Sequence, residues 1–405
     1  MSRILVDSGV NWLGKIPSSW SMCRVKNNFL FHKIIAKEKS VNYDRIALTL
    51  NGVIKRDKDD SNGLQPDNYD GYQIVYKDDL IFKLIDLENV NTSRIGKSEY
   101  EGITSPAYII LTDRCNTRYS LYYFLNMWYQ EIFNNIGGDG VRSAINKDDL
   151  LKVPFITIPL NEQIKIANYL DKQCAKIDEI INENNHEIEL LEEYKKSVFN
   201  DVIKKYKTKK YRLKYLISSK LQYGANSSGI AYDENLPRYV RITDILNNSL
   251  KDNDKLSLSE ESAKEFILKE GDILFARSGG TVGKSFIYRN KFGRCAFAGY
   301  LIRAQFNDIN LSEYVFNYTN SNLYEEWKNS IFIQSTIQNI GADKYNIMPV
   351  PVPIYNNDLL IINKEINLMS KKIDKVIEYR KQIIEKLEEY KRSLIYECVT
   401  GKREV

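Results

Sequence analysis

The sequence predicts an α+β fold in which two similar domains are separated by two long helices. The helices are expected to pair as an antiparallel coiled coil with approximate internal two-fold symmetry. Three observations predict this fold. A charged helical segment occurs twice, each copy is preceded by the same order of short apolar segments, and 405 residues exceed the size of one ordinary hydrophobic core.

The clearest repeat is the segment LEEYKKS at Leu191–Ser197, which returns as LEEYKRS at Leu387–Ser393. The offset of 196 residues is a whole number of heptads, so both copies keep one heptad register. The apolar pattern then predicts positions a and d of a coiled coil. They are Ile177, Ile180, Leu191, Tyr194 and Val198 in the first copy, and Ile373, Val376, Leu387, Tyr390 and Leu394 in the second.

Each copy lies in a segment of about 40 residues, 160–206 and 359–400, that contains neither Pro nor Gly. A helix of that length needs a partner for its apolar stripe, and the other copy is the simplest partner. Asn184 and Arg380 are predicted to occupy polar a positions that disfavour other registers. An antiparallel pair would place the two domains at opposite ends. Two independent surface helices are the alternative.

Short apolar runs bounded by Gly, Asn and Asp precede each helix in the same order, which is typical of strands. We match residues 79–84 with 272–277, 95–98 with 282–285, and 105–110 with 298–302, which makes Tyr108 and Tyr300 equivalent. Each globular part is therefore expected to be α+β with a twisted sheet. The predicted division is a first domain at 1–158, a first helix at 159–206, a second domain at 207–354 and a second helix at 355–405.

Composition disfavours several classes of function. His32, His186 and five scattered Cys offer little material for imidazole catalysis, a zinc site or a disulfide framework. The sequence has no apolar run of membrane-spanning length and no secretory signal, so we expect a cytoplasmic protein without membrane contact. The net charge of +5 is mild, but between Lys207 and Arg303 about 18 Lys and Arg stand against about 10 Asp and Glu. A merely solvated basic surface is the alternative to a nucleic-acid footprint.

Motifs along nearly the whole chain carry a family resemblance. They are Trp12–Trp20, Pro159–Gln163, Tyr211–Leu216, Leu221–Gly224, Arg238–Asp244, Gly271–Ser278, Gly280–Ser285, Phe297–Arg303 and Ser335–Ile340. Together they resemble the specificity subunits of type I restriction-modification enzymes. Two departures stand out. The second helix opens at Pro353–Asp358 without a Glu-Gln pair, and the first domain has Arg142–Ile145 where the second has Gln-Asn.

The resemblance implies a non-catalytic DNA-binding subunit. Such a subunit binds double-stranded DNA with a bipartite, asymmetric target, and it assembles with two adenine methyltransferase subunits and two restriction subunits. It needs no cofactor of its own, since S-adenosylmethionine and ATP are expected on the partners. Repeated helix charges, including Glu192, Glu193, Glu388 and Glu389, are expected on solvated faces or on docking faces for the methyltransferases.

The segment Ser278–Ser285 imitates a phosphate-binding loop, but position 278 holds Ser where the motif requires Gly, and the residues that follow are strand-like. A nucleotide-dependent enzyme is therefore disfavoured. The segment is better suited to contact DNA. Its glycines let the backbone approach a phosphate, its Ser and Thr hydroxyls can donate to the phosphate, and Lys284 can neutralise its charge. Arg241, Arg277 and Arg303 are candidates for guanine edges, and Gln334, Gln338 and Asn339 for adenine.

The predicted DNA-binding set combines these residues with their counterparts in the repeat. Phosphate contacts and structural hydrogen bonds are the alternatives for each member, and a core role is the alternative for the two tyrosines. A coiled-coil scaffold without DNA recognition is the alternative function. The set is Lys83, Arg94, Lys97, Ser105, Tyr108, Arg142, Arg241, Arg277, Ser278, Gly279, Thr281, Lys284, Tyr300, Arg303, Gln334, Thr336, Gln338 and Asn339.

Overall fold

The structure is a computed structural model that describes residues 4–50, 52–59, 68–85, 87, 93–136, 144–246, 248–333 and 339–405. The chain forms two compact units. Unit 1 comprises Met1–Glu183 with Gln382–Val405, and unit 2 comprises Asn184–Lys381. The boundary falls inside both long helices, so each unit contains part of each helix. The four-part division predicted from the sequence follows the helix ends instead and stays a prediction.

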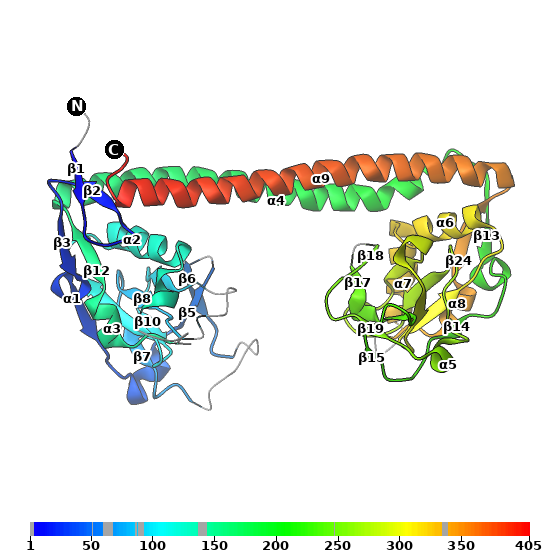
Figure 1. The fold of residues 1–405 in the computed structure, drawn as a ribbon, viewed down its shortest axis with the longest axis horizontal. Helices are drawn as coiled ribbons and strands as arrows, with labels where there is room; N and C mark the ends of the chain where they lie inside the picture. The colour runs from blue at the N-terminus through cyan, green and yellow to red at the C-terminus, as the bar shows by residue number, and fades with distance from the viewer. Residues whose placement is uncertain are drawn as a thin grey trace. The chain divides into compact units, whose positions relative to one another are not determined.

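The long helices are α4 (Leu160–Ile203) and α9 (Asn356–Val399), each of 44 residues without an internal Pro or Gly (Figure 1). Within unit 1, Lys391 of α9 donates to Asp178 of α4 at 2.6 Å. Within unit 2, Arg380 Nη1 donates to Asn184 Oδ1 at 2.9 Å. Lys195 pairs with Asp374 and Lys205 with Glu365 in the same unit. Residues near the end of α4 contact residues near the start of α9, and residues nearer the start of α4 contact residues nearer the end of α9. This order confirms the predicted antiparallel pairing within each unit.

The predicted coiled-coil seam is partly wrong. The pattern of burial places Ile177, Val198, Ile373 and Leu394 in the seam, with Leu191 and Leu387 half-buried. In contrast, Ile180, Tyr194, Val376 and Tyr390 are between 42% and 50% exposed. The buried stripe steps alternately by four and three residues through positions 177, 181, 184, 188 and 191, so residue 180 lies one position off it. The same stripe recurs 196 residues later in α9.

The described residues of unit 1 form two four-stranded sheets, in the orders β4-β11-β8-β9 and β6-β5-β10-β7, and two strand pairs, β1-β2 and β12-β3. Its strands are β1 Leu5–Asp7, β2 Lys15–Pro17, β3 Ser21–Arg24, β4 Phe29–His32, β5 Arg45–Thr49, β6 Gly52–Arg56, β7 Gln73–Val75, β8 Leu80–Phe82, β9 Ile95–Lys97, β10 Gly102–Thr104, β11 Ile109–Asp113 and β12 Pro154–Thr157. Its shorter helices are α1 Val25–Asn28, η1 Lys37–Asn42, α2 Thr117–Tyr129, η2 Ile132–Asn135 and α3 Lys147–Lys152.

Unit 2 contains the sheets β14-β23-β20-β21 and β15-β19-β16-β22, and the pairs β13-β24 and β17-β18. Its strands are β13 Thr208–Arg212, β14 Gln222–Tyr223, β15 Ile230–Ala231, β16 Arg238–Val240, β17 Ile245–Leu246, β18 Ser249–Leu250, β19 Leu256–Ser257, β20 Ile273–Ala276, β21 Ser285–Ile287, β22 Cys295–Phe297, β23 Leu301–Ala304 and β24 Pro349–Pro353. Its shorter helices are η3 Leu213–Tyr215, η4 Ile242–Asp244, α5 Glu260–Ala263, η5 Asn290–Phe292, α6 Ile309–Tyr318, α7 Asn322–Ile333 and α8 Ala342–Ile347.

Sheet β4-β11-β8-β9 of unit 1 has the strand order and register of sheet β14-β23-β20-β21 of unit 2. Phe82 pairs with Ile109 in the first sheet, and Phe275 pairs with Ile302 in the second. With Phe82 and Phe275 taken as equivalent, Tyr300 corresponds to residue 107. The predicted equivalence of Tyr108 and Tyr300 is therefore wrong by one residue.

The predicted match between residues 95–98 and 282–285 is also wrong. Gly96 lies inside β9, where it pairs with Ile81. Phe286 of β21 pairs with Leu274, the counterpart of Ile81, while Gly283 lies in the turn before the strand. The shared Gly-Lys-Ser sequence suggested the match, but the hydrogen-bond register of the two sheets shows that these residues are not equivalent. Two similar sheet-containing domains and two long helices are nevertheless confirmed as the α+β architecture.

Each domain is anchored to the long helices by side-chain contacts, polar in unit 1 and aromatic in unit 2. In unit 1, Arg118 of α2 donates to Asp171 of α4 at 2.6 Å, where α2 lies alongside α4 (Figure 1). In unit 2, the ring centroid of Phe199 lies 5.3 Å from that of Tyr314 of α6. The described helices include none long and apolar enough to cross a membrane.

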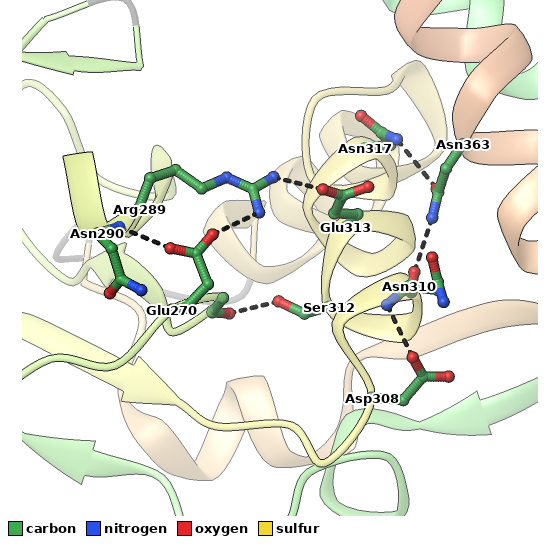
Figure 2. A network of polar contacts seen from close by, with 10 residues as sticks. Glu270, Arg289, Asn290, Asp308, Asn310, Ser312, Glu313, Asn317 and Asn363 are labelled. Atoms are coloured by element: carbon green, nitrogen blue, oxygen red, sulfur yellow. Dashed lines mark hydrogen bonds and ion pairs between the residues drawn. The ribbon is translucent and has the colours of Figure 1, made fainter.

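A polar network in unit 2 joins the β20–β21 hairpin to α6, and α6 to α9 (Figure 2). Arg289 bonds Glu270 at 3.1 Å and Glu313 of α6 at 2.7 Å. Asn363 of α9, which is buried, donates to the carbonyl of Asn310 at 2.7 Å. The second domain is therefore held on its helix by directional bonds as well as by apolar packing.

Candidate nucleic-acid interface

Three strand ends of the sheet β14-β23-β20-β21 converge at one edge. Strand β20 ends at Ala276, β23 begins at Leu301, and β14 ends at Tyr223. Because β14 and β20 are both antiparallel to β23, these ends lie side by side. The residues that continue past them, Arg277 and Tyr300, are thereby brought next to Tyr223.

The guanidinium of Arg277 lies over two aromatic rings at this edge. Its guanidinium carbon is 5.2 Å from the ring centroid of Tyr223 and 5.8 Å from that of Tyr300. Both distances are in the range of cation–π attraction. Tyr300 is 64% exposed and Tyr223 40% exposed, so the rings face solvent as well as the guanidinium. For Tyr300, this exposure rules out the alternative core role.

The segment at Asn339 completes the edge. Asn339 forms an antiparallel bridge with Ser278, and the amide of Ile340 donates to the carbonyl of Arg277 at 2.9 Å. The hydroxyl of Tyr223 accepts from the amide of Ala342 at 3.0 Å. The structure thus brings four predicted residues, Arg277, Ser278, Tyr300 and Asn339, into one cluster.

The glycine-rich segment forms a tight turn beside this cluster. Gly279 and Gly283 have φ angles of +77° and +81°, which favour glycine. The amide of Gly283 donates to the carbonyl of Ala276 at 2.8 Å, and the buried hydroxyl of Tyr324 donates to the carbonyl of Gly283 at 2.6 Å. The turn leads into strand β21 rather than a helix, unlike a phosphate-binding loop.

Lys284 and Gly279 are exposed on this turn, and Thr281 is half-buried. No described residue bonds the Lys284 ammonium. The turn therefore offers an unneutralised cation, a hydroxyl and open backbone, which are the groups that contact phosphates.

Comparison with known families identifies the domain that contains the Arg277 cluster. Residues 192–389 match the family model "Type I restriction modification DNA specificity domain". The chain carries a type I DNA specificity domain. The family expected from the sequence motifs is thereby confirmed, and the matched segment includes Tyr223, Arg277, Tyr300 and the glycine turn.

A solved structure shares the fold of nearly the whole chain. A structure described as "Structural basis underlying complex assembly and conformational transition of the type I R-M system" covers 96% of this chain and 100% of its own, with a TM-score of 0.70 and 10% identity. The HsdS subunit from Thermoanaerobacter tengcongensis covers 96% and 98%, with a TM-score of 0.45 and 11% identity. The type I S subunit from M. genitalium covers 98% and 99%, with a TM-score of 0.40 and 12% identity. No curated protein matches the sequence.

Two arginines of the specificity domain prove less suited to DNA contact than predicted. Arg303 is 7% exposed, donates to the carbonyl of Ile267 at 2.8 Å, and lies 3.7 Å from Asp272. Its burial contradicts the predicted base contact. Arg241 is partly exposed, but its guanidinium bonds both carboxylate oxygens of Asp244, which raises the pKa of Arg241 and occupies its donors.

In the first domain, Arg94 is buried at 3% exposure and donates to the carbonyl of Ile85 at 3.2 Å, which contradicts a DNA contact. Lys97 lies in β9 with its ammonium bonded to Asp78 and Glu99. Burial lowers the pKa of Lys97, and the two carboxylate bonds outweigh that effect and raise it. Its charge is thus already neutralised within the domain.

The remaining first-domain candidates lie near the equivalent sheet edge. Lys83 and Ser105 are half-buried, and the carbonyl of Ser105 accepts from Gln73 at 2.7 Å. Tyr108 is half-buried against an apolar cluster, and burial raises the pKa of its hydroxyl. These three stay predictions. Arg142, Gln334, Thr336 and Gln338 lie outside the described residues.

Sequence analysis missed Tyr223 as a member of the cluster, although its segment Leu221–Gly224 was recognised as a motif. The signal available was its Tyr-Gly pair: a Cβ on Gly224 would lie 2.4 Å from the carbonyl oxygens of Phe297 and Ala298, so only glycine lets the two strands approach. Among the described residues, no group of His, Cys, Asp and Glu is placed to hold a metal ion.

Proposed function

We propose that the chain is the DNA-recognition subunit of a type I restriction-modification enzyme and catalyses no reaction itself. It binds double-stranded DNA at a bipartite, asymmetric target, one half-site for each domain. Two adenine methyltransferase subunits and two restriction subunits assemble with it and supply the binding sites for S-adenosylmethionine and ATP. The match of residues 192–389 to the specificity-domain family carries the proposal.

Two further observations support it. The equivalent sheets of the two units have the same strand order, so the chain offers two related surfaces that differ in sequence. Related but unlike domains suit half-sites that differ, with an unread spacer between them. The structure that shares this fold belongs to a type I system described in terms of complex assembly, which supports the proposed partners.

The decisive experiment is co-expression with the methyltransferase subunit of the same system in a host that lacks adenine methylation. Single-molecule sequencing should then find methylated adenines within one bipartite motif with two unlike halves. A stable purified complex that methylates no DNA would contradict the proposal and favour a coiled-coil scaffold. Binding of the complex to duplex DNA should also weaken steeply as salt rises, whereas a scaffold predicts no salt-sensitive retention.

Domain exchange tests the modular form of the proposal. Replacement of residues 1–150 by the first domain of another family member should change one half-site of the methylated motif and leave the other unchanged. The same sequencing assay measures this. Coupled changes in both half-sites would contradict the assignment of one domain to one half-site.

The proposed docking faces for the methyltransferases lie on the repeated helix segments. Glu192 and Glu193 of α4 and Glu388 and Glu389 of α9 are exposed and equivalent by the 196-residue offset. Each pair precedes an exposed tyrosine, so the faces combine charge with apolar area. Reversal of all four charges to Lys should abolish co-purification with the methyltransferase. Unchanged co-purification of a folded variant would exclude these faces.

A further inference from the structure

The clearest unexplained feature of the second domain is a guanidinium in contact with two tyrosine rings. We propose that Arg277 recognises a guanine in the half-site bound by this domain, and that Tyr223 and Tyr300 hold its guanidinium in position. The inference rests on the proposed function and adds a residue and a base to it. It separates one base-recognising arginine from the other basic residues of the domain.

Arg277 differs from four other arginines of the domain, which pair with carboxylates. Arg289 pairs with Glu270 and Glu313, Arg294 pairs with Glu260, and Arg241 and Arg303 have the carboxylates described above. No described carboxylate pairs with Arg277, and no described residue accepts a hydrogen bond from its side chain. Arg277 is half-buried, and its Nε is buried without a partner among the described residues. Arg277 therefore retains its positive charge and its donors for a ligand.

The two rings determine what the guanidinium can do. A planar guanidinium that packs against aromatic rings still presents N–H donors along its edge. Contact with both rings limits the conformations that Arg277 samples, so less entropy is lost when it binds. A fixed edge with two parallel donors matches the O6 and N7 acceptors of guanine in the major groove. The same edge also matches a phosphate, and the experiment below distinguishes the two ligands.

The residues beside Arg277 have two further roles in the proposed DNA contact. Ser278 and Asn339 flank Arg277 through their backbone bridge, which fixes the backbone on both sides of the guanidinium. Lys284 is exposed on the neighbouring turn and lacks a described partner. Its mobile ammonium suits the phosphate backbone, which gives affinity without sequence preference. The cluster thus pairs one specificity contact with one affinity contact.

The test measures sequence preference with the chain in complex with its methyltransferase. The probe is a library of duplexes randomised at each position of the motif that the wild-type complex methylates. Wild type should require guanine at one position of the half-site assigned to residues 207–354. Arg277→Ala should reduce the preference for that guanine by about 5- to 150-fold and leave the other half-site unchanged. Arg277→Lys should lose most of the same preference, because an ammonium cannot donate along a fixed edge.

Two matched variants isolate the roles of the neighbours. Tyr223→Leu with Tyr300→Leu removes both rings and should weaken the guanine preference in the same direction as Arg277→Ala. Lys284→Ala should weaken binding to all duplexes alike and lower the salt dependence, without a change of motif. Arg241→Ala, at an arginine already bound to Asp244, should leave the guanine preference intact.

The outcomes separate this inference from the function on which it rests. If wild type methylates a bipartite motif but Arg277→Ala weakens all sequences equally, Arg277 contacts phosphate and the inference is wrong. The same conclusion follows if the affected position is not guanine. If wild type has no bipartite motif at all, the proposed function fails before Arg277 is tested.

Discussion

The two equivalent sheets differ most where their strands end. In the second domain the edge cluster is Arg277 with Tyr223 and Tyr300. Strand register places Leu84, Lys33 and residue 107, an alanine, at the matching positions of the first domain. Lys33 donates to the carbonyl of Pro106 at 2.9 Å, and Leu84 is buried. The two domains thus share the hydrogen-bond register of this sheet, whereas the residues just past the strand ends differ between them.

Inside the sheets, the two domains also differ in the side chain that partners an equivalent buried carboxylate. Asp79 and Asp272 are equivalent and almost fully buried. Asp79 lies 3.0 Å from His32 Nε2 on β4, whereas Asp272 lies 3.7 Å from Arg303 on β23. Burial raises the pKa of Asp272 and lowers the pKa of Arg303, as expected of an ion pair out of water. The side chain that partners the carboxylate comes from a different strand in each domain.

Removal of these carboxylates should have the largest and most unequal effect. Asp272→Ala leaves the Arg303 guanidinium buried without a counter-charge, which should cost about 3 to 5 kcal/mol. Asp79→Ala leaves no guanidinium without a partner and removes only the hydrogen bonds that Asp79 makes with His32, Thr112 and the amide of Tyr76, so the cost should be about 1 to 3 kcal/mol. Hydrogen exchange followed by mass spectrometry on peptides from β20 and β8 measures the opening free energy of each sheet.

The double variant Asp272→Ala with Arg303→Ile provides the control, because residue 110, the counterpart of Arg303, is already isoleucine. It removes both charges and should recover part of the loss. An equal loss in the two single variants would show that the nature of the cation does not matter.

Anchoring of the glycine turn is a second difference between the domains, with a smaller expected effect. Tyr324→Phe removes the hydroxyl that donates to Gly283 and leaves that buried carbonyl without its bond, which should cost about 1 to 2 kcal/mol. Amide exchange in residues 278–284 should quicken, while residues 95–98, which lie in or beside β9, should exchange as before. Tyr122→Phe in α2 is a matched control, since its hydroxyl bonds Asp171 instead. Faster exchange at both sites would mean that the substitution acts on the whole chain.

Sequence analysis predicted the helices well because heptad periodicity depends on local spacing. The offset of 196 residues made Asn184 and Arg380 equivalent polar positions of the two helices, and the structure joins them by a hydrogen bond. The seam at Ile180 and Tyr194 was misassigned because apolar residues one position off the stripe look the same in sequence.

The register of the strands and the burial of charged side chains were harder to predict from the sequence. The likeness of Tyr108 to Tyr300 suggested an equivalence that the pairing of Ile109 with Phe82 excludes. Arg94 and Arg303 resemble surface cations in sequence, and only their burial and their bonds to distant carbonyl groups show that they are internal. The cluster around Arg277 combines three strand ends and Asn339, so its geometry depends on the whole sheet.

The smallest effects are expected where the two halves of the chain are most alike. Asp178 pairs with Lys391 in unit 1, and Asp374 pairs with Lys195 in unit 2, and the two pairs are related by the 196-residue offset. All four side chains are at least partly exposed, so Asp178→Asn and Asp374→Asn should each cost less than about 1 kcal/mol. Thermal melts at low and high salt measure this, and the difference from wild type should shrink as salt screens the pairs. A large, salt-independent loss in one variant alone would mean that the equivalent ion pairs have different structural roles.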